Sequence, residues 1–318
     1  MISEEALRLR RTNWRTFFRR YGIVISFLLL CLALSLLSDR FLTWTNILNV
    51  LRQSSINGII AVGMTMVILT AGIDLSVGAI LALTCVVTAD LLQKGLPVPL
   101  AMLTGLALGA ALGMFSGILV SYLRIPPFIA TLGMMTVSRG LALTYTQGRP
   151  ITALPASFDF LGAGSLGPIP MPIVVVGLIF LLGYFVLSRT TLGINIYALG
   201  DNPVAARLSG ISVSKVILFV YALSGFLSAL AGMILTGRLD SAQPTAGSGY
   251  EFDAIAAVVV GGTSLAGGEG NLFGTLVGTL LIGVLNNGLN LLNVSALWEG
   301  VVKGAVIALA LLLYRSFK

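Results

Sequence analysis

The sequence has no histidine, two cysteines and few charged residues: charged side chains make up 10% of its 318 residues. Without histidine it lacks both the commonest protein metal ligand and the usual acid–base group near neutral pH. Cys31 and Cys85 each lie within an apolar run, not in a spaced framework. These absences exclude most enzyme classes and any disulfide-based fold, so we expect no catalytic residue, cofactor or metal.

A phosphate-binding loop of the Gly-x-x-x-x-Gly-Lys-Ser/Thr type is also missing. The glycine-rich candidate Gly267-Gly-Glu-Gly270 carries a glutamate and no lysine that would meet phosphate. We therefore predict that the chain does not hydrolyse ATP by itself. Its acidic residues are scattered, which disfavours a proton relay without excluding a proton-coupled carrier.

Apolar residues dominate instead, at 57% of the chain, and the mean hydropathy is +0.99. One crossing of a bilayer core takes roughly 20 apolar helical residues. Apolar segments run over residues 21–38, 47–70, 77–93, 99–123, 128–146, 171–188, 215–237, 254–266, 272–293 and 295–314. We predict an all-α polytopic membrane protein with about ten transmembrane helices. The eighth segment is short, so it should follow a broken or re-entrant path.

The basic residues indicate a topology and not a nucleic-acid partner, although the net charge is +7. Six arginines precede the first apolar segment, and basic residues beside a first span hold that side in the cytoplasm. With ten crossings, both termini are then cytoplasmic. Residues 1–20 form a basic cytoplasmic segment, and 21–318 form a single transmembrane domain whose first span is retained.

Two stretches interrupt the apolar pattern with glycines and an acidic residue. The first covers residues 70–78 and includes Asp74 and Ser76; the second lies within 253–270 and includes Glu269. Paired broken helices favour a transport path, because half-helix ends and free backbone groups can meet polar cargo. A carboxylate near the bilayer centre costs about 2.5 to 3.5 kcal/mol. Asp74 therefore either caps the following helix or contacts cargo.

Buried amides and glycines mark the remaining helices. Asn286, Asn287 and Asn290 lie within a late apolar segment. They either line the translocation path or bond across a helix interface. Glycines four residues apart, as in Gly105-Leu-Ala-Leu-Gly109, predict close helix packing.

A short helix is predicted in the hydrophilic loop 189–214, which the topology places in the cytoplasm. Asn202 is a favourable N-cap, Pro203 suits the first helical position, and Ser209-Gly210 should end the helix. A rigid cytoplasmic piece of this kind suits a transporter driven by a separate ATPase. A plain surface turn is the alternative.

Four stretches resemble the permease subunits of bacterial ATP-binding-cassette (ABC) importers for monosaccharides, over roughly residues 40–313. They span 57–78, 128–133, 197–211 and 239–268, and include Gly72-Ile-Asp-Leu-Ser-Val-Gly78 and Tyr197-Ala-Leu-Gly-Asp-Asn-Pro-Val-Ala-Ala-Arg-Leu-Ser-Gly-Ile211. The resemblance implies a multi-pass protein of the bacterial inner membrane that moves ribose or a similar sugar by alternating access.

The resemblance also implies partners: an ATPase subunit on the cytoplasmic face, a periplasmic sugar-binding protein outside, and a second copy or a sister permease. The residues expected to engage the ATPase are Asn202, Pro203, Ala206, Arg207, Leu208 and Gly210. Asp240, Gln243 and Glu251 fall at an external junction and are expected to face the binding protein. A permease for branched-chain amino acids or another small polar solute, or a secondary carrier, is the alternative.

Overall fold

The computed structural model describes residues 22–295, 298, 300–302 and 304–305. In chain order the elements are the helix Gly22–Leu37, α2 (Trp44–Leu69), α3 (Val77–Gln93), α4 (Val98–Ser121), α5 (Pro127–Thr146), β1 (Ile151–Thr152), α6 (Ala156–Ala163), β2 (Ser165–Leu166), β3 (Ile169–Pro170), α7 (Met171–Arg189), α8 (Thr191–Asp201), α9 (Pro203–Leu208), α10 (Val213–Leu239), β4 (Ser241–Ala242), α11 (Tyr250–Val260) and α12 (Leu272–Leu291).

The described part is mostly helical, as the apolar pattern predicts. Four of its helices, α4, α7, α10 and α12, are long and apolar enough to cross a membrane. The first nine predicted apolar segments each coincide with a helix. The basic segment 1–20 and most of the tenth apolar segment, 295–314, lie outside the described residues, and so do both termini.

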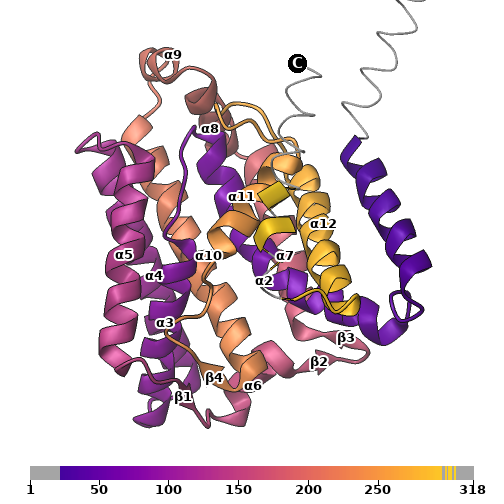
Figure 1. Cartoon of the computed structure of the whole chain (residues 1–318). Coiled ribbons are helices and arrows are strands. Elements are labelled where there is room, and N and C mark those ends of the chain that lie inside the picture. Colours follow the sequence, from indigo (N-terminus) through magenta and orange to yellow (C-terminus); the bar gives the residue numbers. More distant parts are fainter. Residues whose placement is uncertain (1–21, 296–297, 299, 303, 306–318) are drawn as a thin grey trace, which may run out of the picture.

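The connecting segments gather at two opposite ends of the helix bundle (Figure 1). α8 and α9 lie at one end, whereas α6 and the four short strands lie at the other. There, β1 pairs antiparallel with β4, so that Ile151 faces Ala242, and β2 and β3 form a hairpin. The stretch 147–170, which the topology predicts to be external, is therefore tied to the end of α10.

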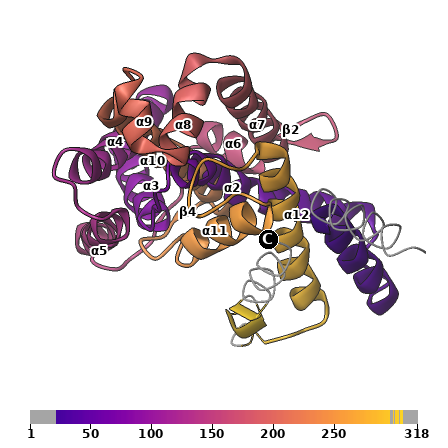
Figure 2. The same cartoon turned by 90° about the horizontal axis from the view of Figure 1, so that it is seen from above.

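α2 is central to the packing and contacts α7, α10, α11 and α12. In the view of Figure 2 it lies between α3, α4, α5 and α10 on one side and α11 and α12 on the other. Its second half is buried without interruption from Gly58 to Leu69. Lateral surfaces of α4 and α7 stay exposed and apolar, as expected of helices that face lipid.

α4 packs against α10 through a row of glycines. Gly105, Gly109, Gly113 and Gly117 are all buried on α4. A methyl group on Gly113 would lie 2.1 Å from the backbone oxygen of Tyr221 in α10. The predicted close packing through four-residue glycine spacing is confirmed here, because only glycine lets these two backbones approach so closely.

We predict that Gly113→Ala lowers the free energy of unfolding by roughly 1–3 kcal/mol, because the added methyl meets backbone that cannot rotate away. Titration of the detergent-solubilised protein with sodium dodecyl sulfate measures the loss. Gly133→Ala is the control, since a methyl there meets nothing within 4 Å. Equal stabilities of the two variants would contradict the packing role.

Candidate translocation site and coupling helix

The first interruption begins where α2 closes with a compact hydrogen-bonded cap. Ala71 adopts a left-handed backbone with φ +59°. Its N–H donates to the oxygen of Ile68 at 2.9 Å, and the N–H of Gly72 donates to the oxygen of Val67 at 3.1 Å. This paired pattern satisfies carbonyls that the end of the helix leaves free. The chain then continues without helix to Ser76, and we call residues 70–76 the buried link.

Asp74 holds the buried link to the helices around it and is itself fully buried. Its Oδ1 accepts a hydrogen bond from the N–H of Ser76 at 3.0 Å and another from the hydroxyl of that serine. Its Oδ2 accepts from the hydroxyl of Ser224 in α10 at 2.8 Å. These contacts give Asp74 a structural role, but it is not a cap in the strict sense, because α3 begins at Val77 and its N-cap Ser76 has no side-chain capping bond.

The second interruption covers residues 261–271, between α11 and α12. Within the predicted broken stretch 253–270, residues 253–260 are helical and form most of α11, so the break itself is the glycine-rich part that follows. The two interruptions meet: the N–H of Gly268 donates to the oxygen of Leu69 at 3.0 Å. The second interruption thus supplies a hydrogen-bond donor to a carbonyl at the end of α2.

A third element reaches the same point. Gly200, near the end of α8, lies so close that a methyl group there would be 1.8 Å from the oxygen of Leu69 and 2.4 Å from the nitrogen of Gly268. The hydroxyl of Tyr197, one turn earlier in α8, donates to the oxygen of Gly270 at 2.9 Å. We call the meeting of Leu69, Gly200 and Gly268 the glycine junction.

α9 has the local structure that its capping residues predict. The Oδ1 of Asn202 accepts from the N–H groups of Val204 and Ala205 at 3.0 Å each, and Pro203 is the first helical residue. Gly210 follows with φ +83°. Among the residues expected to engage an ATPase, Ala206 is buried within its own chain, whereas Asn202, Pro203, Arg207, Leu208 and Gly210 are exposed.

The three residues expected to face a binding protein do not share one surface. Asp240 and Gln243 are exposed, but Glu251 is only 7% exposed. The turn before α11 carries Glu251 inward, and its Oε1 accepts from the N–H of Gly249 at 3.2 Å. Asp240 accepts a hydrogen bond from the N–H of Leu154, so it also anchors the stretch 147–170.

Sequence reasoning missed Arg139, which ties α5 to the same turn. Its Nη1 donates to the backbone oxygens of Pro244 and Ala246 at 2.8 Å each, and its Nη2 lies 3.4 Å from the oxygen of Gly78. The signal was present, because an arginine within an apolar helix needs buried partners. Arg139 therefore connects the turn before α11 to the start of α3.

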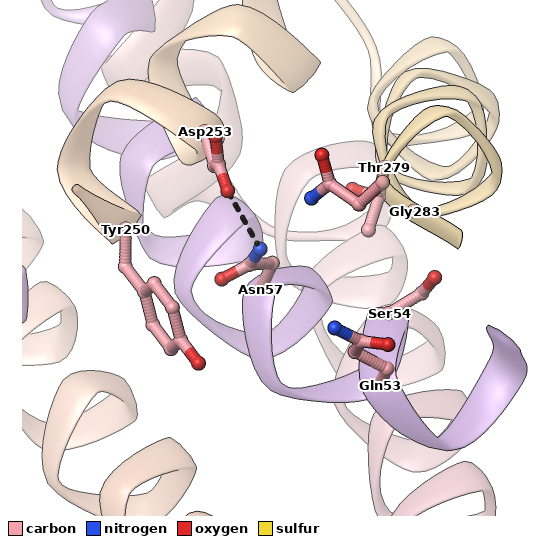
Figure 3. Close-up of a pocket in the computed structure, with 8 residues that line it drawn as sticks. Gln53, Ser54, Asn57, Tyr250, Asp253, Thr279 and Gly283 are labelled. Atoms are coloured by element: carbon pink, nitrogen blue, oxygen red, sulfur yellow. Dashed lines mark hydrogen bonds between the residues drawn. The ribbon is translucent and has the colours of Figure 1, made fainter. Parts of the chain in front are cut away.

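A polar pocket of about 80 Å³ opens between three helices. Figure 3 shows Gln53, Ser54 and Asn57 from α2 facing Tyr250 and Asp253 from α11 and Thr279 and Gly283 from α12; Asn286 of α12 completes the lining. The Nδ2 of Asn57 donates to Asp253 at 3.4 Å. Every lining residue that the structure describes is polar or glycine, which is unusual between apolar helices.

Comparison with known proteins connects this arrangement to transport. The family described as the permease component of branched-chain amino acid transport systems matches residues 46–311. The chain belongs to this permease family. It is therefore a multi-pass inner-membrane protein and a transport component, as its resemblance and apolar helices predict.

Individual relatives cover nearly the whole permease. The ribose import permease of Bacillus subtilis strain 168 is 51% identical over 309 residues, which cover 96% of each chain. The ribose import permease of Escherichia coli K12 is 50% identical, covering 95% of this chain and 96% of its own. The D-allose permease of the same organism is 41% identical, covering 99% and 97%. No solved structure matches.

The three asparagines of α12 have different surroundings in the permease. Asn286 lines the polar pocket. Asn287 exchanges two amide hydrogen bonds with Asn46 of α2, at 3.0 and 2.9 Å. Asn290 is exposed and donates to the backbone oxygen of Asn286. The two open interpretations thus apply to different residues: Asn287 bonds across a helix interface, and Asn286 borders a cavity.

We predict that Asn46 and Asn287 stabilise the permease as a pair. In a double-mutant cycle of Asn46→Leu and Asn287→Leu, the coupling energy should be about 0.6–1.7 kcal/mol, which runs from the average to the largest value for hydrogen bonds between membrane helices. Unfolding in sodium dodecyl sulfate measures it. Asn290→Leu should be close to neutral, and purely additive effects of the first two changes would contradict the pairing.

Proposed function

We propose that this permease is the membrane-spanning subunit of an ATP-driven importer that carries a monosaccharide, ribose or a similar sugar, into the cytoplasm. The identity of 50–51% to ribose import permeases over 95–96% of this chain supports this most directly. Relatives named for D-allose and xylose are less similar, at 41% and 34–36%. The family description names branched-chain amino acids, but these relatives are all named for sugars.

The proposed topology has ten crossings with both termini in the cytoplasm. Residues 1–20 form a cytoplasmic segment, 21–318 form one transmembrane domain, and 189–214 form the cytoplasmic coupling loop. The separation of α8 and α9 from α6 and the strands, at opposite ends of the bundle, supports this orientation (Figure 1). The exposed Arg124, Arg189 and Arg207 all lie in segments that it assigns to the inside.

Transport then needs three partners. A separate ATPase supplies the energy, a periplasmic binding protein delivers the sugar at the end formed by α6 and the strands, and a second permease copy or a sister permease completes the path. Asp240 and Gln243 are exposed at that outer end and are the docking residues that we keep in the proposal. Glu251 would act there only through the turn that it supports.

We propose that the ATPase binds α9. This helix presents two large apolar side chains to solvent, Val204 at 68% and Leu208 at 85% exposure, beside Arg207. Exposed apolar anchors flanked by a charge are typical of a protein interface. Ala206 faces the other way and seats α9 on its own chain.

The glycine junction offers a route from α9 to the transport path. A shift of α9 moves the end of α8, where Gly200 contacts both Leu69 of α2 and Gly268 in the segment that joins α11 to α12. The helices α2, α11 and α12 line the polar pocket. At these contacts the backbones touch without deformable side chains between them. A small displacement of α8 would therefore displace the end of α2 and the segment between α11 and α12 as well.

We predict that Arg207→Glu and Leu208→Asp each lower sugar uptake at least tenfold and leave membrane insertion unchanged, because neither side chain is buried in this chain. Uptake of labelled D-ribose, with the permease quantified in membranes, measures the effect. Arg124→Glu is the matched control: it makes the same charge change on an exposed residue outside the coupling loop. Normal uptake by both variants would refute the coupling role of α9.

The proposed function is tested by gentle purification of the permease from native membranes. We expect a Walker-motif ATPase to co-purify, and its hydrolysis should rise when a binding protein loaded with D-ribose is added. A permease that purifies alone, with uptake that collapses when the proton gradient is dissipated while ATP is maintained, would show a secondary carrier instead.

A further inference from the structure

The polar pocket holds buried hydrogen-bonding atoms that have no partner in the part of the chain that the structure describes. Ser54 and Asn286 are 4% and 7% exposed. The hydroxyl of Ser54, the Oδ1 of Asn57 and the Oδ1 of Asn286 have no hydrogen bond within the described residues. Buried polar atoms are nearly always paired, because an unpaired one costs roughly 1–3 kcal/mol. Three such atoms around one cavity indicate a site that a ligand or water fills.

We propose that this pocket binds hydroxyl groups of the sugar during its passage, with Ser54, Asn57 and Asn286 as direct contacts. This inference rests on the proposed function and adds the residues that touch the cargo. Each unpartnered carbonyl oxygen accepts a hydrogen bond and donates none, so it needs a donor. A sugar hydroxyl is such a donor, and it can also accept a hydrogen bond from the Ser54 hydroxyl.

The chemistry of the lining favours a neutral polyol over an amino acid. Asp253 contributes a carboxylate to the lining, and no described lining residue offers the positive charge that would pair with the carboxylate of an amino acid cargo. Among the described residues, the lining contains no leucine, isoleucine, valine or methionine against which a branched aliphatic side chain could pack. An unpaired hydroxyl or amide is therefore expected to select cargo that can hydrogen-bond with it.

Gly283 leaves room in the pocket for the Ser54 hydroxyl. A methyl group on Gly283 would lie 1.9 Å from the Ser54 hydroxyl oxygen, so a larger residue would push that hydroxyl away. A cavity needs about 10–15 Å³ to admit one water. The pocket, at about 80 Å³, therefore accepts the hydroxyl-bearing edge of a monosaccharide. Water occupies these positions between transport events and is exchanged for hydroxyls of similar bonding capacity.

The first experiment compares variants in proteoliposomes that contain the permease with its ATPase and binding protein. Ser54→Ala and Asn286→Ala should each lower the maximal uptake rate of D-ribose about three- to tenfold, as expected for one lost hydrogen bond to cargo. Two matched controls should keep normal uptake. Ser55→Ala removes a neighbouring hydroxyl that bonds within α2, and Asn290→Ala removes an exposed amide that bonds within α12.

A second measurement separates contact with cargo from a structural role. In a Cys31→Ser, Cys85→Ala background, Asn286→Cys should react with a small hydrophilic thiol reagent, and D-ribose should slow that reaction several-fold. L-leucine should have no effect. The reaction at Asn290→Cys should not respond to D-ribose.

The outcomes distinguish the two proposals. Transport of D-ribose by the unmodified complex, together with normal uptake in both pocket variants and no protection of Asn286→Cys, would overturn the pocket assignment alone. Failure of the unmodified complex to transport D-ribose or any other monosaccharide would overturn the proposed function and this inference with it. Protection by L-leucine in place of D-ribose would overturn the assignment of a hydroxylated cargo.

Discussion

The structure depends on satisfying a stretch of backbone that leaves the helical path inside a bundle of membrane helices. No water or lipid group can bond such backbone in the hydrocarbon region, so protein must. Just before the buried link, the oxygen of Leu69 accepts from Gly268, and within the link the oxygen of Ile73 accepts from Tyr221 and Thr131. Each bond comes from a different element. The link therefore holds α5, α10 and the segment 261–271 in one fixed arrangement around α2 and α3.

Glycine makes this arrangement possible by removing side chains where backbones meet. Gly113 lets α4 reach α10, Gly200 lets α8 reach the end of α2, and Gly78 lies where a methyl group would be 2.1 Å from the oxygen of Gly247. The Gly200 contact also connects α8, which precedes the exposed helix α9, to the end of α2 and to the segment between α11 and α12. Tight packing and the transmission of movement that we propose thus have one physical cause, which is the absence of deformable side chains at the contacts.

Residue type and spacing predicted some polar roles and left others undecided. Asn286 and Asn287 are adjacent and chemically identical, yet one borders the pocket and the other pairs with Asn46. Helical periodicity gives a direction around the axis, but it does not say which helix lies in that direction. The sequence analysis placed Glu251 and Ala206 at surfaces, because the sequence does not show which segment packs over them. Packing buries both.

The sequence by itself determined the class of protein, the positions of nine helices and the start and end of α9. These depend on local physics: apolar length matches bilayer thickness, and the Asn202 cap bonds within three residues of itself. Only the tertiary structure decided that the interruptions meet at Leu69, that Arg139 binds the turn at Pro244 and Ala246, and that α2, α11 and α12 enclose a polar pocket. These contacts join residues far apart in the chain, so they arise from how the helices pack and have no local signature.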